Sequence, residues 1–193
     1  MAQTTRLHRY TYADYVGIEV GSSGKHEFFD GEIYAMAGGT EDHSALSVAI
    51  TSALLRAAAG GECRVHSSDL RVYVEAVGLA TFPDGSVVCG PLLQHAASPK
   101  TTALNPTVLV EVTSDSSEDY DCGLKLEAYR TVPSLRDYIV VSHRERRITV
   151  HHREAQAWTT RVAIAGGSVR VESLGADLLV DVIYAVSSIA SPA

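Results

Sequence analysis

The sequence lacks any apolar run long enough to cross a membrane. The longest stretch free of charged residues, glycine and proline runs from His43 to Leu55, well short of the roughly 20 residues that a bilayer requires. Arg6 and Arg9 are followed by the tyrosine-containing segment 10–15 rather than by an apolar segment, so we expect no secretory signal. These two absences argue against a transmembrane protein.

Cysteine is also scarce. The three cysteines, Cys63, Cys89 and Cys122, form no CxxC pair, which argues against a zinc ribbon. An odd number of cysteines without a secretory signal is typical of proteins that keep free thiols in a reducing compartment. We therefore expect free thiols and a cytoplasmic location.

Signatures of several common enzyme classes are missing. The chain contains no GxxxxGK[ST], GxGxxG, GxSxG or HExxH motif, so nothing supports an ATPase, a dinucleotide enzyme, an α/β-hydrolase or a zincin. An excess of positive charge is missing too, because the net charge is −7. A surface that binds phosphates is usually basic, so a nucleic-acid role would require a local basic patch or bound cations.

What is present fits one domain with a real core. The chain has 193 residues, of which 46% are hydrophobic, and this size corresponds to a single domain. We expect one domain over residues 1–193, with its core at about 10–184. Periodicity and turn residues predict an α+β or mixed α/β fold with one central sheet. The expected helices are 12–20, 40–59 and 115–131, the expected hairpin is 25–29 with 32–37, and the later strands are 63–67, 70–75, 86–89, 107–112, 137–142, 148–152, 158–164, 168–172 and 178–182.

One acidic residue interrupts the most apolar strand pattern. Glu111 lies in the β-branched run 107–112, and burying an unpaired charge costs several kcal/mol. Asp84 immediately precedes the expected strand 86–89. If these two strands are neighbours, both carboxylates converge on one divalent cation, and Lys125 on the following helix would point to the same place.

The same residues have an ordinary structural interpretation. Glu111 would pair with an arginine such as Arg71, Asp84 would cap a turn, and Lys125 would be solvated on the helix surface. A set of two carboxylates and a lysine over such a span is common by chance. Spacing alone therefore leaves both interpretations open.

Several motifs that rarely occur together follow one another along the chain. They are KHEFFDGEIYAMAG, EDHSAL, SSDLRV, FPDGSVVC, LVEVTSDSSEDYDCGLKLEAYRTVPSLRDYIVV and ITVHHR. Over about Tyr10 to Tyr184 they resemble the Uma-two family, a bacterial group assigned as endonucleases of the PD-(D/E)xK restriction-endonuclease-like superfamily. The resemblance implies a mixed central β-sheet flanked by helices, with an N-terminal β-hairpin.

The resemblance also implies a metal site. Asp84 and Glu111 match the two motif acids of the family, and with the backbone carbonyl of Val112 they would hold Mg²⁺ or, alternatively, Mn²⁺. Thr113 occupies the position where the superfamily usually has its strand lysine. Lys125 matches a family lysine further along the helix that takes this role.

Other matches leave alternatives open. Glu27 matches a hairpin acid that many superfamily members place near the metal, but it could instead form a cross-strand surface pair with Lys25 or with a Lys or Arg elsewhere. His43 matches a family histidine, and Asp69 a strand-start acid, although helix-terminal and turn-capping roles suit them equally well. The basic segment Arg144–Arg153 is either a ridge that contacts phosphates or a solvated hairpin. Gly85, where the family has an apolar residue, is expected to loosen the start of its strand.

The predicted function is hydrolysis of DNA phosphodiester bonds by a Mg²⁺-dependent endonuclease. The main alternative is a catalytically degenerate nuclease-fold module that binds nucleic acid or protein, which the missing strand lysine and the negative charge favour. A metal hydrolase acting on a small phosphate ester would use the same residues. We further expect a homodimer, because nucleases that cut both strands often pair and because a large β surface invites contacts between sheets. For Lys125→Met we expect a change of only about ±0.5 kcal/mol in stability.

Overall fold

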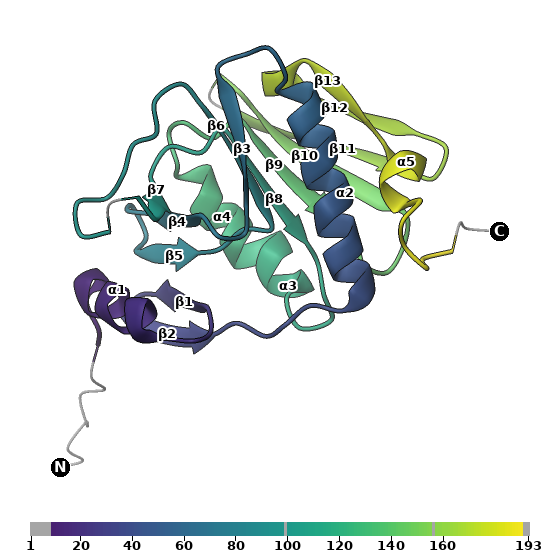
Figure 1. Ribbon diagram of the computed structural model, residues 1–193. Coiled ribbons are helices and arrows are strands. Elements are labelled where there is room, and N and C mark those ends of the chain that lie inside the picture. The colour runs from purple at the N-terminus through teal and green to yellow at the C-terminus, as the bar shows by residue number, and fades with distance from the viewer. Residues whose placement is uncertain (1–8, 99, 156, 191–193) are drawn as a thin grey trace.

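A computed structural model describes residues 9–98, 100–155 and 157–190 (Figure 1). Its helical elements are α1 (Tyr12–Gly21), α2 (Glu41–Ala57), α3 (Glu118–Tyr120), a π-helical segment (Asp121–Lys125), α4 (Leu126–Arg130), a 3₁₀ segment (Glu172–Leu174) and α5 (Val180–Tyr184). Its strands are β1 (His26–Phe29), β2 (Glu32–Ala35), β3 (Cys63–Ser67), β4 (Arg71–Val74), β5 (Leu79–Thr81), β6 (Gly85–Cys89), β7 (Thr102–Ala103), β8 (Val108–Val112), β9 (Asp137–Val141), β10 (Arg147–Glu154), β11 (Ala157–Ile164), β12 (Ser168–Val171) and β13 (Ala176–Leu179).

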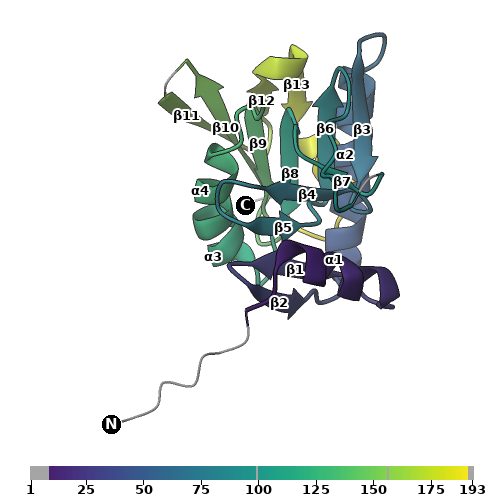
Figure 2. The same cartoon turned by 90° about the vertical axis from the view of Figure 1, so that its left-hand side faces the viewer.

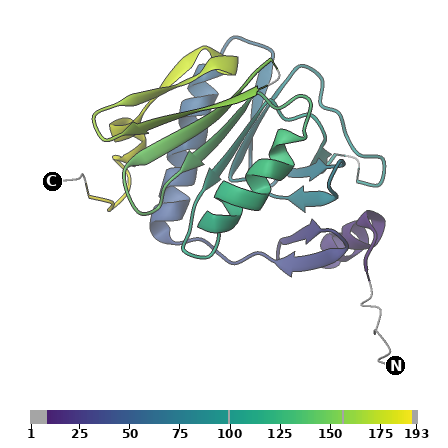
Figure 3. The same ribbon diagram turned by 180° about the vertical axis from the view of Figure 1, so that it is seen from behind.

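The strands form mixed sheets flanked by helices. The largest sheet has six strands in the order β11-β10-β9-β8-β6-β3, and a second has five in the order β2-β1-β5-β4-β7. Helix α2 covers one face of the six-stranded sheet, and the helical segment from α3 to α4 covers the other (Figures 1 and 3). The view turned by 90° shows the sheet between these helices, with the hairpin β1-β2 and α1 at one end (Figure 2).

The six-stranded sheet is the expected central sheet, and a second sheet that was not predicted accompanies it. The N-terminal hairpin does not join the six-stranded sheet, because β1 pairs with β5, with Phe28 opposite Ala80. Strand β5 went unpredicted, since it is only three residues long and wholly buried, so it shows no alternation. The predicted strand 178–182 also differs, because β13 ends at Leu179 and α5 begins at Val180.

The central strand β8 separates two hydrophobic layers. Val108, Val110 and Val112 pack in the core beneath α2, whereas Leu109 packs in the core beneath α4. Successive side chains of a strand point to opposite faces, so Glu111 lies on the α4 face. Strand β8 is antiparallel to β6 and parallel to β9, which confirms that the strands preceded by Asp84 and containing Glu111 are neighbours.

The helix predicted over 115–131 is shorter and irregular. It begins at Glu118, because the backbone N–H of Ser114 donates to the Ser117 hydroxyl at 3.1 Å and holds this stretch as a turn. The π-helical segment Asp121–Lys125 then interrupts the α-helix. Such π segments often occur at functional sites, and this one ends at Lys125, one of the predicted catalytic residues.

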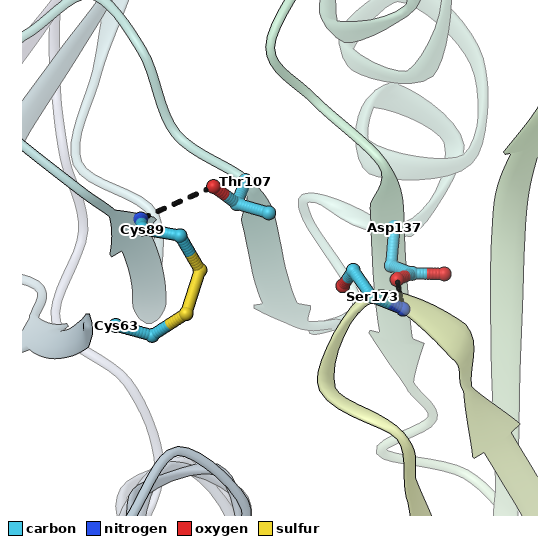
Figure 4. Close-up of a disulfide and its surroundings, with 5 residues drawn as sticks. All are labelled: Cys63, Cys89, Thr107, Asp137 and Ser173. Atoms are coloured by element: carbon cyan, nitrogen blue, oxygen red, sulfur yellow. Dashed lines mark hydrogen bonds between the residues drawn. A yellow bond between two sulfur atoms is a disulfide. The ribbon is translucent and has the colours of Figure 1, made fainter. Parts of the chain in front are cut away.

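A disulfide joins Cys63 and Cys89, contrary to the expectation of free thiols (Figure 4). The two residues are direct partners in the antiparallel pair β3-β6, a pairing that cysteine spacing does not reveal. The backbone N–H of Cys89 also donates to the Thr107 hydroxyl at 3.2 Å. Cys122 is free and exposed, but partial burial and the nearby Asp121 raise the pKa of its thiol, which disfavours a reactive thiolate.

The disulfide leads to a stability prediction. The variant Cys63→Ser/Cys89→Ser is expected to lose about 3 kcal/mol in free energy of unfolding, because the bond closes a loop between residues 26 apart in sequence. Urea denaturation measures this loss, and a reducing agent should produce it in the wild type but not in the variant. Cys122→Ser is the control and should leave the stability unchanged. Equal stability of the oxidised wild type and the double variant would contradict the bond.

None of the helices in the described ranges has the length and apolarity of a membrane span.

Candidate metal and active site

Ionisable side chains from four separate parts of the chain meet beside the end of β8. Three of them contact the Lys125 ammonium, whose Nζ lies 3.0 Å from Glu27 Oε1, 3.0 Å from Glu111 Oε1 and 3.2 Å from Asp121 Oδ1. A fourth acid, Asp84, accepts a hydrogen bond at 2.8 Å from the backbone N–H of Val112, the residue after Glu111. The structure therefore brings together Glu27, Asp84, Glu111 and Lys125, all four predicted catalytic residues.

Lys125 is a buried cation. Its exposed fraction is only 4%, so the interpretation of a solvated surface lysine is wrong. Burial alone would lower the pKa of Lys125, but the carboxylates of Glu111, Glu27 and Asp121 raise it well above the usual value. The ammonium also lies 5.3 Å from the centre of the Tyr120 ring. Lys125 thus remains charged at neutral pH and acts as a fixed positive charge.

Glu111 is a buried acid that reaches this lysine from β8, and it is only 4% exposed. Its Oε1 accepts a hydrogen bond from the Tyr129 hydroxyl at 2.8 Å as well as the contact with Lys125. Burial raises the pKa of Glu111 to about 8, and the neighbouring carboxylates add to this rise against the opposing effect of Lys125. The alternative pairing with Arg71 is wrong, since that guanidinium lies 5.1 Å from the centre of the Tyr15 ring and makes no ion pair within the described residues.

Glu27 belongs to the cluster rather than to the surface. Its carboxylate accepts a hydrogen bond from the Thr81 hydroxyl besides contacting Lys125. Lys25 instead donates to Asp69 at 2.9 Å, so the alternative surface pair of Glu27 with Lys25 is wrong. Asp69 is exposed and lies in this separate pair, outside the cluster.

Asp84 joins two strands and contacts α2. Its Oδ2 lies 3.3 Å from His43 Nε2, and the hydrogen bond with Asp84 raises the pKa of His43 against the effect of burial. A Cβ atom added to Gly39 would lie 2.6 Å from His43 Nδ1, so only glycine leaves room for the ring there. Asp84 therefore bonds the backbone of β8 and contacts His43 rather than only capping its own turn. His43 likewise contacts Asp84 rather than only solvent at the helix terminus.

The cluster carries more negative than positive charge. Glu27, Asp84, Glu111 and Asp121 surround a single lysine, with His43 at the margin. Carboxylates held this close repel one another unless a cation or a proton intervenes. Burial is the main reason that the pKa of Glu111 is raised, and this repulsion adds to the rise.

Two carboxylates of the cluster, Asp84 and Glu111, could contribute ligands to a metal ion. Across the described ranges, no three His, Cys, Asp or Glu side chains surround a common point as a metal site would. Mg²⁺, however, is usually held by one or two carboxylates, with waters and substrate oxygens completing the shell. Asp84 Oδ1 and Glu111 Oε2 accept no hydrogen bond from any described residue, so each carboxylate keeps one oxygen for an ion. The Val112 backbone lies beside both Asp84 and His43.

Comparisons with known proteins give the family. A family model, Uma2, described as "putative restriction endonuclease", matches residues 12–181. The chain belongs to the Uma2 (Uma-two) family. Two Synechocystis proteins are similar to it: slr1290 is 36% identical over 172 residues, covering 89% of each chain, and sll1609 is 28% identical over 144 residues, covering 72% of this chain and 76% of its own.

A solved structure supports the fold of this Uma2 chain. A protein from Anabaena variabilis, described as a "putative nuclease belonging to DUF820", superposes with a TM-score of 0.72. The two chains are 16% identical, and the match covers 89% of this chain and 96% of the other. The likeness confirms the expected fold, a mixed β-sheet with flanking helices.

The basic segment of this Uma2 chain is occupied by internal contacts. Arg144 pairs with Asp115 and Glu118, and Arg153 donates to two backbone carbonyl oxygens. These contacts favour a structural hairpin over a ridge that contacts phosphates. The adjacent histidines His151 and His152 point to opposite faces of their strand and have different partners. His151 bonds the Thr160 hydroxyl, and His152 bonds the Asp137 carboxylate. Asp137 also accepts a hydrogen bond from the Ser173 N–H (Figure 4).

Two members of the cluster were missed from the sequence. Asp121 precedes Lys125 by four residues, and Tyr129 follows it by four. Side chains at this spacing lie on one face of a helix, so the spacing was an available signal. The π-helical segment changes the local geometry but keeps the contact between Asp121 and Lys125.

Proposed function

We propose that this chain is a Mg²⁺-dependent endonuclease that hydrolyses DNA phosphodiester bonds, with Mn²⁺ as a substitute for Mg²⁺. One observation carries the proposal: the buried Lys125 ammonium contacts Glu111 at 3.0 Å beside Asp84, within an excess of carboxylates. Membership of the Uma2 family supports a nuclease. The metal and the DNA substrate are inferred from the chemistry of these side chains.

Each side chain has a role that follows from its surroundings. The free oxygens of Asp84 and Glu111, with the Val112 carbonyl, would hold the ion. When bound, Mg²⁺ supplies Lewis acidity to a phosphoryl oxygen and lowers the pKa of a bound water. Lys125 keeps its proton, so it stabilises charge that develops on the phosphate and does not act as a base. Glu27 holds the Lys125 ammonium in position.

Lys125 also bears on the alternative of a degenerate binding module. That alternative draws on Thr113, which replaces the usual strand lysine. The ammonium of Lys125 reaches Glu111 from the helix instead, so the cation required near the motif acid is present. This contact favours an active enzyme over a degenerate module.

Metal binding tests the site directly. Asp84→Ala and Glu111→Ala are each expected to weaken Mn²⁺ binding by at least about tenfold, because each removes one of two carboxylate ligands. Isothermal titration calorimetry measures the affinity, and cleavage of plasmid and oligonucleotide DNA in Mg²⁺ measures the activity. Asp69→Ala, which removes an exposed carboxylate in a separate pair, is the control.

The outcomes separate the three functions. Unchanged Mn²⁺ affinity in both alanine variants would refute the metal site. Cleavage of a small phosphodiester but of no DNA would favour the small-substrate hydrolase. DNA binding without cleavage by the wild type, in either Mg²⁺ or Mn²⁺, would favour the binding module.

A further inference from the structure

Helix α2 has two opposite faces with different surroundings. Its inward face carries Leu46, Ile50 and Leu54, all fully buried, and His43 beside Asp84. Its outward face lies next to α5 (Figure 1). A shallow groove follows this outward face and is lined by Glu41, Ser44, Ala45, Val48, Ala49, Ser52, Arg56, Val182 and Val186.

The groove is apolar along its centre and open to solvent. Val48 is 65% exposed, and Val182 and Val186 are 54% and 55% exposed. Scattered exposed apolar residues are normal, but these three valines line one groove and form a small apolar strip that a partner could cover. Ala45, Ala49 and the two serines are small, so a second helix could approach closely.

Charges of opposite sign stand at the two ends of this strip. Glu41 lies in the first turn of α2 and Arg56 in the last, about 22 Å apart along the helix axis. Neither forms an ion pair within the described part of the chain. The apolar centre at Val48 lies midway between them.

This pattern is complementary to itself. If a second α2 runs antiparallel across the first, with a two-fold axis at the peptide bond between Val48 and Ala49, Glu41 of each copy faces Arg56 of the other. The same axis sets Ala45 opposite Ser52. Isologous dimers require this property, that one patch complements its own two-fold copy, whereas an unrelated partner would require no such symmetry.

We propose that the outward face of α2, with Val182 and Val186, binds a second copy of this chain in a two-fold symmetric dimer. The two α2 helices run antiparallel, with the Glu41–Arg56 pairs closing both ends of the interface. Because His43 and the candidate active site lie on the inward side of α2, the dimer leaves both active sites open. The homodimer expected from the sequence rested on sheet contacts, so this interface is a different one.

Charge exchange tests the dimer. Sedimentation velocity over a concentration series gives the dissociation constant of the full chain. Glu41→Arg and Arg56→Glu are each expected to raise it by roughly tenfold or more, since each places like charges at both ends. The variant that carries both substitutions restores opposite charges in each pair and is expected to recover affinity close to that of the wild type.

Control variants distinguish the loss of the dimer interface from the loss of folding. Glu75→Arg reverses an exposed acid elsewhere and should leave the dimer intact. Val48→Asp changes a position that is already exposed, so the variant should stay folded by circular dichroism. By sedimentation velocity it should be a monomer. A monomeric wild type at 0.1–1 mM, a dimer that tolerates Val48→Asp, or a double variant no tighter than the single variants would each overturn the proposal.

Discussion

Lys125→Met is expected to lower the rate of DNA cleavage by about 10²–10³-fold and the free energy of unfolding by about 3–5 kcal/mol at pH 7.5. The rate falls because the variant lacks the fixed positive charge beside Glu111. The stability falls because Glu27, Glu111 and Asp121, which are all buried or nearly buried, lose their common hydrogen-bonding and charged partner. The structure thus replaces the small stability change expected for a surface lysine with a large one.

Lys25→Met is the matched control for this variant. Lys25 pairs with the exposed carboxylate of Asp69, and such a pair contributes about 1 kcal/mol or less. Urea denaturation and a cleavage assay on each variant, with metal affinity measured separately, resolve the two effects. A Lys125→Met protein with wild-type stability would mean that the carboxylates do not depend on the lysine. Cleavage of DNA by Lys125→Met at the wild-type rate would show that Lys125 takes no part in the reaction.

The metal-free protein is expected to become less stable as pH rises from about 5 to about 8. The pKa of Glu111 is raised from about 4.5 to about 8 in the folded state, so between these values the folded protein binds a proton that the unfolded chain has lost. Stability falls with pH wherever the folded state binds more protons, by up to about 1.4 kcal/mol per pH unit for one group. This contribution is fully present below pH 4.5 and lost above pH 8.

Magnesium should reverse this loss. The ion requires the ionised carboxylate, so its binding at pH 7 should release about one proton. Millimolar Mg²⁺ should therefore raise the melting temperature more at pH 8 than at pH 6. Calorimetry in buffers of different ionisation enthalpy counts the protons, and differential scanning fluorimetry follows the melting temperature.

Glu111→Gln provides the decisive variant for this prediction. This variant has no titrating group at position 111. The fall in stability that Glu111 causes between pH 5 and pH 8 and most of the rise in melting temperature with Mg²⁺ should therefore disappear together. Asp69→Asn is the control and should retain both. A melting temperature that Mg²⁺ leaves unchanged at pH 8, or an equal gain in Glu111→Gln, would contradict a metal at Glu111.

The local elements near the N-terminus could be predicted from the sequence. Thr40, directly before α2, is its N-cap, and the dipeptide Asp30-Gly31 makes the turn of the hairpin, with positive φ at both residues. The buried residues of α2, Leu46, Ile50 and Leu54, repeat every four positions. These features depend on contacts among residues close in sequence, so the sequence pattern is sufficient for them.

Four members of the candidate site were predicted from the sequence, but their interactions were not, and neither were Asp121 and Tyr129. An acid in a β-branched strand and the motifs shared with the family pointed to Asp84, Glu111, Lys125 and Glu27. The sequence alone left open whether Glu111 contacts Arg71 or Lys125, and whether that lysine is buried. Those questions depend on which helix packs over which face of β8.

The sequence by itself determined the first two helices, most of the strands, the class of fold and four residues of the candidate site. Only the tertiary structure decided the separate five-stranded sheet, the disulfide between Cys63 and Cys89, and the burial of Lys125 among three carboxylates. The physical reason is the range of the interactions. Capping and periodicity act within a few residues, whereas strand pairing and charge burial join segments that only the packing of the whole chain brings together.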